Sequence, residues 1–116
     1  MKRTIEEMQQ AIKEFCDDRD WEQFHNPKDL AIGISTEANE LLDLFRFKNG
    51  EELNTVMEKH RIDVEDEIAD VFFYVLRFAH LNHIDLDEAL KNKMYKNGLH
   101  YPKELAKGSN KKYNEF

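Results

Sequence analysis

The sequence predicts an all-α protein with four main helices. Glycine and proline are scarce, at four and two in 116 residues, and long stretches carry apolar side chains three and four residues apart, the spacing of one helix face. Strands have little support. The length fits one domain with a single core, because soluble domains most often contain roughly 100–150 residues. We therefore expect residues 1–116 to form one helical domain.

The first predicted helix covers about residues 4–18. It starts with a capping box, in which Thr4 and Glu7 satisfy each other's backbone N–H groups, and it ends at the acidic pair Asp17 and Asp18. Its apolar stripe consists of Ile5, Met8, Ile12 and Phe15. Cys16 lies on or beside this stripe, which favours a small core residue over a nucleophile.

The second predicted helix starts with Asn26 as its N-cap and Pro27 in its first turn. It is expected to close at residues 48–50, Lys-Asn-Gly, which tolerate a left-handed helix end. Its apolar face consists of Leu30, Ile34, Ala38, Leu41 and Phe45. Residues 51–61 are polar and poorly periodic, so we expect a connecting loop there with at most a short helical turn.

The third predicted helix covers about residues 62–80 and is apolar over such a wide arc that a central position is expected. The fourth starts at Asp85, which forms a second capping box with Glu88, and is stopped by Gly98 and Pro102. Residues 107–116 begin with a basic segment and are predicted to be a flexible tail.

The composition limits the partners that this protein can bind. A net charge of −7 disfavours a nucleic-acid polymer, since that binding relies on Lys and Arg displacing counterions from the phosphate backbone. The longest apolar run, residues 71–76, falls far short of the roughly 20 residues that cross a bilayer, so no membrane partner is expected. The acidic N-terminal segment argues against a secretory signal. A single cysteine, Cys16, favours a reducing, cytoplasmic location.

Four carboxylates form two pairs on consecutive predicted helices. Glu37 and Glu40 are three residues apart on the second helix, with Glu37 inside its apolar arc and Glu40 at the border. Glu67 and Asp70 repeat this spacing on the third helix, with Tyr74 on the same side. Packing these faces together would bring four negative charges close, which is unfavourable without a cation between them. Mg²⁺, a hard cation often shared with substrate phosphates, is the expected cofactor, with Mn²⁺ as the alternative.

Other interpretations of these motifs stay open. Either acidic pair alone is more often a solvated helix face than a metal site. Glu22 and His25 form an E-x-x-H unit of the kind that builds di-iron sites in helical bundles, but such sites need two copies and the sequence has one. His80 and His83 have a spacing suited to a metal without a third ligand nearby, so we interpret them as imidazoles facing water at a helix end.

The sequence resembles a known family at several motifs. Residues 37–40 (Glu-Ala-Asn-Glu) and 67–70 (Glu-Ile-Ala-Asp) resemble the E-x-x-E, spacer, E-x-x-D signature of the all-α nucleoside triphosphate pyrophosphohydrolases, the MazG-like superfamily. Residues 19–25 (Arg-Asp-Trp-Glu-Gln-Phe-His) and 44–47 (Leu-Phe-Arg-Phe) resemble the segments around the metal helix in the dCTP pyrophosphatase branch. Residues 93–113 resemble that branch's closing motif.

The resemblance implies a four-helix MazG-like bundle that hydrolyses a (deoxy)nucleoside triphosphate to the monophosphate and pyrophosphate, with dCTP or a modified pyrimidine nucleotide as candidate substrate. It implies that Mg²⁺ is held by Glu37, Glu40, Glu67 and Asp70. Glu37 or Glu40 would also orient or deprotonate the attacking water. The base would be bound by Trp21, His25, Phe47 and Tyr74, and the phosphate, sugar or base would be contacted by Lys93 and Asn97.

A bundle this short is too small to enclose such a site alone, and the third helix has a wide apolar arc, so a homodimer or homotetramer is expected. Two other functions stay open. One is a non-catalytic helical module that binds a nucleotide or a partner helix through the same face. The other is phosphoribosyl-ATP pyrophosphohydrolase activity within the same superfamily, which the segment 21–25 disfavours. Taken without the resemblance, Trp21 and Phe47 are better explained as core cover and Lys93 as a surface charge.

Overall fold

The computed structural model describes residues 1–116 and is all helical, with no strand. The all-α class predicted from the sequence is therefore confirmed, whereas the four-helix bundle and the oligomer stay predictions. Contacts within the chain divide it into two compact units, Met1–His83 and Ile84–Phe116, which are described separately below. The organisation as one domain and the flexible tail at residues 107–116 stay predictions. No helix is both long and apolar enough to span a membrane.

The four predicted helices correspond to the four longest helices of the structure. Three belong to the first unit: α1 (Ile5–Asp17), α2 (Pro27–Asp43) and α4 (Arg61–Leu81). The fourth, α5 (Leu86–His100), belongs to the second unit. The shorter elements are η1 (Glu22–Phe24), α3 (Glu51–Lys59), α6 (Lys103–Ala106) and η2 (Tyr113–Glu115). The prediction of four main helices thus omitted two short α-helices.

The predicted helix starts are found where capping residues satisfy the first backbone N–H groups. The hydroxyl of Thr4 accepts from the Glu7 N–H at 3.1 Å, and the Glu7 carboxylate accepts from the Thr4 N–H at 2.9 Å, which completes the capping box. Asn26 also caps α2, without a reciprocal box: its side-chain oxygen accepts from the Asp29 N–H at 2.9 Å. At α5 only half of the predicted box forms, because Asp85 accepts from the Glu88 N–H and no bond returns from the Glu88 side chain.

Most of residues 51–61 are helical, because α3 covers Glu51–Lys59 and α4 starts at Arg61, so the prediction of a connecting loop is wrong for most of this segment. Gly50 precedes α3 with a positive φ of 56°, a backbone conformation that glycine adopts without steric cost. Acidic residues in the first turn and Lys59 in the last turn suit the helix dipole. Val56, at 3% exposed, supplies the one buried contact. A helix with so few buried positions leaves too short an apolar stripe for the sequence pattern to reveal.

Two predicted helix ends are also corrected. Helix α2 ends at Asp43 and not at residues 48–50, because the backbone tightens into hydrogen bonds three residues apart, from the Leu44 N–H to Leu41 and from the Phe45 N–H to Leu42. Helix α5 continues past Gly98 to His100, so the correction concerns Gly98, and Pro102 does lie just beyond the helix end as predicted. Gly98 does not take a left-handed conformation, so it sits inside the helix, where glycine is merely unfavourable.

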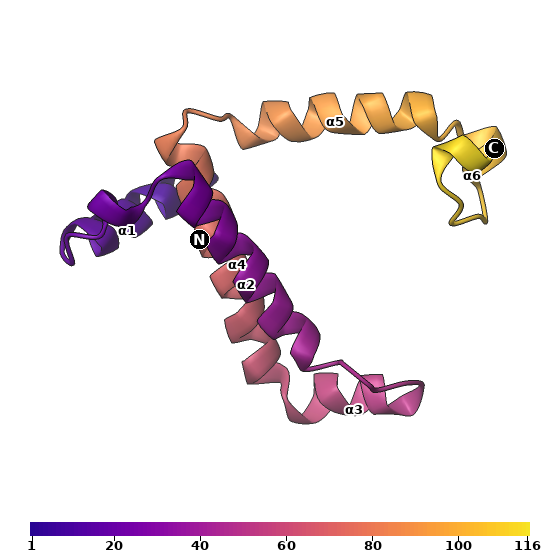
Figure 1. Cartoon of the computed structure of the whole chain (residues 1–116), viewed down its shortest axis with the longest axis horizontal. Coiled ribbons are helices and arrows are strands. Elements are labelled where there is room, and N and C mark those ends of the chain that lie inside the picture. Colours follow the sequence, from indigo (N-terminus) through magenta and orange to yellow (C-terminus); the bar gives the residue numbers. More distant parts are fainter. The chain divides into compact units, whose positions relative to one another are not determined.

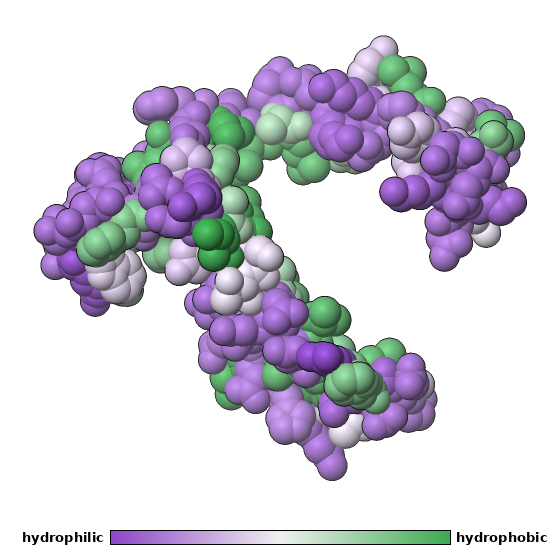
Figure 2. Space-filling view, in the orientation of Figure 1, coloured by the Kyte–Doolittle hydropathy of each residue, from purple (hydrophilic) through white to green (hydrophobic).

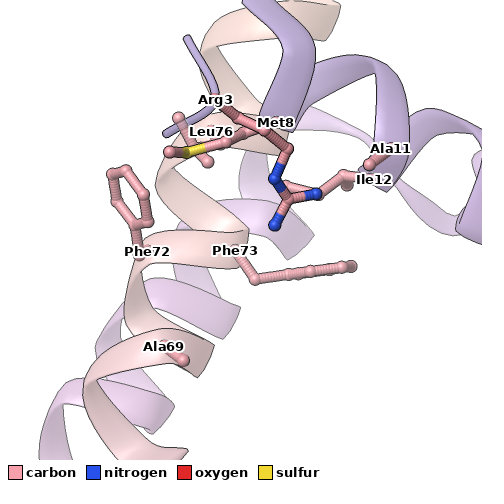
Figure 3. Close-up of a pocket in the computed structure, with 8 residues that line it drawn as sticks. All are labelled: Arg3, Met8, Ala11, Ile12, Ala69, Phe72, Phe73 and Leu76. Atoms are coloured by element: carbon pink, nitrogen blue, oxygen red, sulfur yellow. The ribbon is translucent and has the colours of Figure 1, made fainter. Parts of the chain in front are cut away.

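In the first unit, α2 and α4 run antiparallel with α3 at their joined end, and α1 packs on α4 (Figure 1). The core of this unit consists of Cys16, Leu30, Val56, Leu76 and Ala79, each at most 3% exposed. Cys16 is fully buried, which confirms its interpretation as a core residue. Between α1 and α4 lies an open cavity of about 200 Å³, lined mostly by apolar side chains and by Arg3 (Figure 3).

Many large apolar side chains lie on the surface of both units. Hydrophobic surface is visible along the α2–α4 pair and along α5 (Figure 2). On α4 a patch with an entirely apolar lining consists of Ile68, Ala69, Val71, Phe72 and Val75. Ile68 is 50% exposed and Phe72 is 41% exposed. This patch, called the α4 patch below, is the exposed part of the wide apolar arc predicted for the third helix.

Candidate functional site

The antiparallel pairing of α2 with α4 brings three of the four predicted acidic residues together. Glu37 comes from α2, and Glu67 and Asp70 come from α4. One carboxylate oxygen of each residue lies within 4.8 Å of one from each of the others. The spacing of three residues on α4 places Glu67 and Asp70 on one side of the helix, toward α2. The predicted convergence of the two helices at their acidic positions is therefore present for these three residues.

Glu40 lies beside this group without being part of it. Its side chain is exposed, yet a hydrogen bond to Glu40 contributes to the raised pKa of both Glu37 and Glu67. Glu40 is therefore within reach of a carboxylate on each helix. The structure thus brings three of the four predicted carboxylates close enough to share one ion, and the role of Glu40 as a fourth ligand stays a prediction.

Burial and the neighbouring negative charges raise the pKa of two carboxyl groups in this cluster, Glu37 and Glu67. Burial is the first cause that raises the pKa of Glu37 to about 7, followed by the hydrogen bond with Glu40 and by the charges of Glu40, Asp70 and Glu67. The pKa of Glu67 is raised for the same reasons, again with burial first. The Oε2 atoms of Glu37 and Glu67 are buried and have no hydrogen-bond partner. Buried acceptors without donors are costly, so the cluster is built in a way that favours a cation among its oxygens.

The donor set fits a hard divalent cation. Every ligand atom on offer is a carboxylate oxygen, the type that Mg²⁺ and Mn²⁺ prefer, and no cysteine or histidine belongs to the cluster. Magnesium commonly takes only one or two protein carboxylates and keeps its remaining positions for water and substrate phosphates. Three converging carboxylates with a fourth beside them are sufficient for that role.

An aromatic pocket of about 290 Å³ opens directly next to the acidic cluster. Its walls combine two of the acids with four aromatic side chains: Phe15, Trp21, Glu37, Asp70, Phe73 and Tyr74. The rings pack edge to face, with centroids 5.6 Å apart for Phe15 and Trp21 and 5.5 Å apart for Phe73 and Tyr74. Flat apolar walls that end at a group of carboxylates suit a molecule with a planar ring at one end and a cation-bound anion at the other.

Tyr74 owes its position to a glycine on the facing helix. A Cβ atom at Gly33 would lie 2.6 Å from two ring atoms of Tyr74, so only glycine lets α2 approach the ring this closely. Burial, and then the charges of Glu37 and Asp70, raise the pKa of the Tyr74 hydroxyl. The hydroxyl therefore stays protonated at neutral pH and can donate a hydrogen bond beside the acidic cluster.

The remaining predicted substrate residues are not part of this pocket. His25 lies next to Trp21, with ring centroids 6.5 Å apart, but does not line the pocket. Phe47 is 86% exposed and has a positive φ of 65°, with the Arg46 guanidinium 4.7 Å from its ring centroid. Lys93 and Asn97 are exposed and lie four residues apart on α5, in the second unit. Their roles in binding stay predictions.

The competing metal interpretations can also be placed. The Nδ1 atom of His25 accepts a hydrogen bond from Arg77, so this nitrogen is already occupied in the E-x-x-H unit. His83 is exposed, as predicted. The prediction that both imidazoles face water is wrong for His80, whose Nδ1 is buried without a partner. No cluster of possible metal ligands includes either residue.

Three residues of this region were not predicted to belong to it. Phe15 was assigned to the α1 core stripe, but it is 43% exposed and forms a pocket wall. Phe73 lies within the apolar run 71–76, so nothing in the sequence distinguishes it from its apolar neighbours. Arg77 is 1% exposed and follows Tyr74 by three residues. Residues 70, 74 and 77 are four and three positions apart, so Arg77 lies on the same side of α4 as Asp70 and Tyr74. This spacing was the signal in the sequence that could have predicted Arg77 as part of the site.

Comparison with known proteins gives the family. A model of the MazG-like family matches residues 32–116, a span that includes all four carboxylates. The chain belongs to the MazG-like family. Mouse dCTP pyrophosphatase 1 is 36% identical over 115 residues, which is 97% of this chain and 68% of the mouse protein. The human protein of the same name is 35% identical over the same shares.

A solved structure agrees with this assignment. A pyrophosphatase from Archaeoglobus fulgidus superimposes with a TM-score of 0.82 at 40% sequence identity, over 88% of this chain and 95% of that one. The resemblance noted in the sequence is thereby confirmed. This MazG-like protein is a nucleotide pyrophosphohydrolase, as its relatives indicate. Family members of this kind are generally metal-dependent, and the carboxylate cluster on α2 and α4 offers oxygen ligands of the type that such a metal needs.

Proposed function

We propose that this MazG-like protein is a Mg²⁺-dependent enzyme that cleaves (deoxy)nucleoside triphosphates between the α and β phosphates, releasing the monophosphate and pyrophosphate. The observation that carries the proposal is the meeting of Glu37, Glu67 and Asp70 within 4.8 Å at the edge of an aromatic pocket. The relatives named dCTP pyrophosphatase 1 support dCTP, or a modified pyrimidine nucleotide, as the candidate substrate.

The metal ligands in this proposal are Glu37, Glu40, Glu67 and Asp70. A bound Mg²⁺ would neutralise the cluster and polarise the triphosphate oxygens. Because a nearby positive charge favours the ionised form, it would also lower the raised pKa values of the carboxyl groups. Mn²⁺ has the same preference for oxygen ligands and is the expected substitute.

The chain's own residues then position the reactants. Glu37 or Glu40 orients or deprotonates the attacking water, and the raised pKa of Glu37, about 7, is near the value that suits a general base at neutral pH. Trp21 and Tyr74 bind the base through their rings, as two walls of the aromatic pocket. Phe47 and His25 are proposed to contact the base, and phosphate, sugar or base contacts are proposed for α5, at Lys93 and Asn97.

The active form is proposed to be a homodimer or homotetramer. The α4 patch supports this, because an entirely apolar lining with Ile68 half exposed is unusual on a surface that stays in water. Burying such a patch between two copies would also bring more of the chain around an acidic cluster that one copy leaves open. A cytoplasmic location stays a prediction from the single cysteine.

The test is a product assay on the intact chain. The protein is incubated with Mg²⁺ and a panel of canonical and modified dNTPs and NTPs, and monophosphate, pyrophosphate and orthophosphate are measured. Monophosphate and pyrophosphate in equal amounts are expected. Orthophosphate as the first product would show that a different bond is cut, and thermal stabilisation by Mg²⁺ and nucleotide without any product would favour a non-catalytic binding module.

Two matched variants identify the acids that matter. Glu37→Gln and Asp70→Asn should each abolish product formation while keeping the helical circular dichroism signal. Glu65→Gln is the control, because Glu65 lies on the same helix as Asp70, is exposed and pairs only with Arg61 at 3.5 Å. A Glu37→Gln variant as active as Glu65→Gln would contradict the assignment of the site.

A further inference from the structure

Arg77 on α4 is the one buried charged side chain of this protein. It is 1% exposed, and its Nη1 and Nη2 atoms have no hydrogen-bond partner in the chain. The only hydrogen bond of its guanidinium runs from Nε to the Nδ1 atom of His25, at 3.1 Å and across 52 positions of sequence. A buried cation without a hydrogen-bond partner is costly, so losing this single bond to the imidazole would be strongly unfavourable.

The direction of this bond fixes the state of His25. A guanidinium has donors and no acceptor, so the atom that it faces must offer a lone pair. Nδ1 of His25 therefore carries no proton, and the neutral imidazole has its proton on Nε2. Protonation of Nδ1 would direct an N–H of a cationic ring at the N–H of a cationic guanidinium.

The surroundings of His25 also favour its neutral form. Burial, and then the charge of Arg77, lower the pKa of His25, while Glu22 on η1 opposes them as the smaller influence. Arg77 and Glu22 are the charged groups that act on this imidazole. His25 should therefore stay neutral at pH values where a free histidine is already partly charged.

The imidazole contacts one wall of the pocket, Trp21, although it does not itself line the pocket. The rings of His25 and Trp21 meet at 63° with centroids 6.5 Å apart, and Trp21 is one of the pocket walls. We propose that Arg77 is a positioning residue that holds His25 as the neutral Nε2–H tautomer, so that the imidazole offers one hydrogen-bond donor to a nucleobase bound beside Trp21. This inference rests on the proposed function for the identity of the ligand. The nucleobase must then present an acceptor to His25, either a carbonyl oxygen or an unprotonated ring nitrogen.

The tautomer is tested without any nucleotide, by ¹⁵N NMR of the histidine side chains in the full chain. His25→Gln identifies the resonances of His25 by their disappearance. In the wild-type protein Nε2 should carry the proton and Nδ1 should show the shift of a hydrogen-bonded acceptor, down to a pH below 6.5. Arg77→Met should weaken the Nδ1 hydrogen-bond signature and raise the pKa of His25, and Arg77→Lys, which keeps a cationic donor group, should restore part of the wild-type behaviour in both. A proton on Nδ1 in the wild type, or identical titrations in all three proteins, would overturn the proposal.

The donor role is tested by nucleotide kinetics on the same proteins. Arg77→Met should raise KM by about three- to tenfold, the effect of losing one ordinary hydrogen bond, with a smaller change in kcat. His25→Ala should raise KM at least as much, whereas His25→Gln should recover most of that loss, since an amide can accept from Arg77 and donate to the base at every pH. His25→Gln as weak as His25→Ala would refute the donor role.

The NMR titration and the nucleotide kinetics distinguish failure of this proposal from failure of the proposed function. If the wild-type protein turns over no nucleotide in the product assay, the proposed function fails and the donor role fails with it, whereas the NMR titration still decides the tautomer. If Arg77→Met does not fold, Arg77→Lys and the two His25 variants carry the test, because all three keep a cationic side chain at position 77.

Discussion

Replacing Gly33 by alanine is expected to destabilise the α2–α4 pair and to disturb the pocket. A Cβ atom at this position would lie 2.6 Å from Cδ1 and Cε1 of Tyr74 and 2.9 Å from its Cζ. Carbon atoms in contact usually stay about 3.5–4.0 Å apart. The Tyr74 ring or the helix backbone must therefore shift by about 1 Å to admit the methyl group.

The magnitude follows from two opposing effects. Overpacking of this kind costs about 1–3 kcal/mol, and alanine inside a helix is favoured over glycine by about 1 kcal/mol. Gly98 on α5 separates the two, because nothing lies within 4 Å of a Cβ atom at that position. Gly98→Ala should therefore show only the helix-forming gain of about 0.5–1 kcal/mol. Gly33→Ala should then be less stable than Gly98→Ala by about 1–3 kcal/mol.

Two assays check this prediction. Urea unfolding followed by circular dichroism and by Trp21 fluorescence gives the stabilities of wild type, Gly33→Ala and Gly98→Ala. Nucleotide kinetics should show a raised KM for Gly33→Ala only, since Tyr74 lines the pocket. The reasoning would be refuted by a Gly33→Ala protein that gains stability as Gly98→Ala does and keeps the wild-type KM.

Other predictions concern charge, assembly and capping. The pKa of Glu37 in the folded protein, about 7, exceeds its ordinary value of 4.5. The folded state therefore binds more protons than the unfolded state between these values, and the metal-free protein should lose stability as pH rises through this window. Glu37→Gln should flatten that pH dependence in urea unfolding, and an unchanged slope would count against the raised pKa. Mg²⁺ should stabilise the wild type more at pH 8 than at pH 5, because the carboxyl groups must lose protons to bind it; thermal melts with and without Mg²⁺ measure this. Ile68→Glu in the α4 patch should lower the mass found by sedimentation, and an unchanged mass would remove the patch from the interface. Thr4→Ala should cost about 0.5–2 kcal/mol of unfolding free energy through the lost cap, whereas Thr4→Ser should stay close to wild type.

Local interactions explain why much of the fold was predictable. The caps at Thr4 and Asn26 need only a side chain and the backbone three residues away. The apolar stripes of α1, α2 and α4 have the helical period because each helix buries one face. The acidic pairs were visible for the same reason, since a spacing of three residues fixes which side chains share a helix side.

Elements with few buried side chains escaped prediction. Helix α3 buries only Val56, so its sequence shows almost no periodic signal. The early end of α2 depends on a tightened turn before Phe47 and on a left-handed backbone at that residue, which a phenylalanine gives no reason to expect. Tertiary contacts and turn geometry decide such features, and they are absent from any local pattern.

The sequence by itself determined the helical class, the caps of the first two helices and the four acids at matching positions of two helices. Only the tertiary structure decided that Glu37, Glu67 and Asp70 meet within 4.8 Å, that Phe15 and Phe73 complete an aromatic pocket, and that Arg77 holds His25. The physical reason is that a helix period specifies a direction around one axis, whereas contacts between side chains depend on how two axes pack. At Gly33, where a missing side chain lets α2 reach Tyr74, a single position sets that packing.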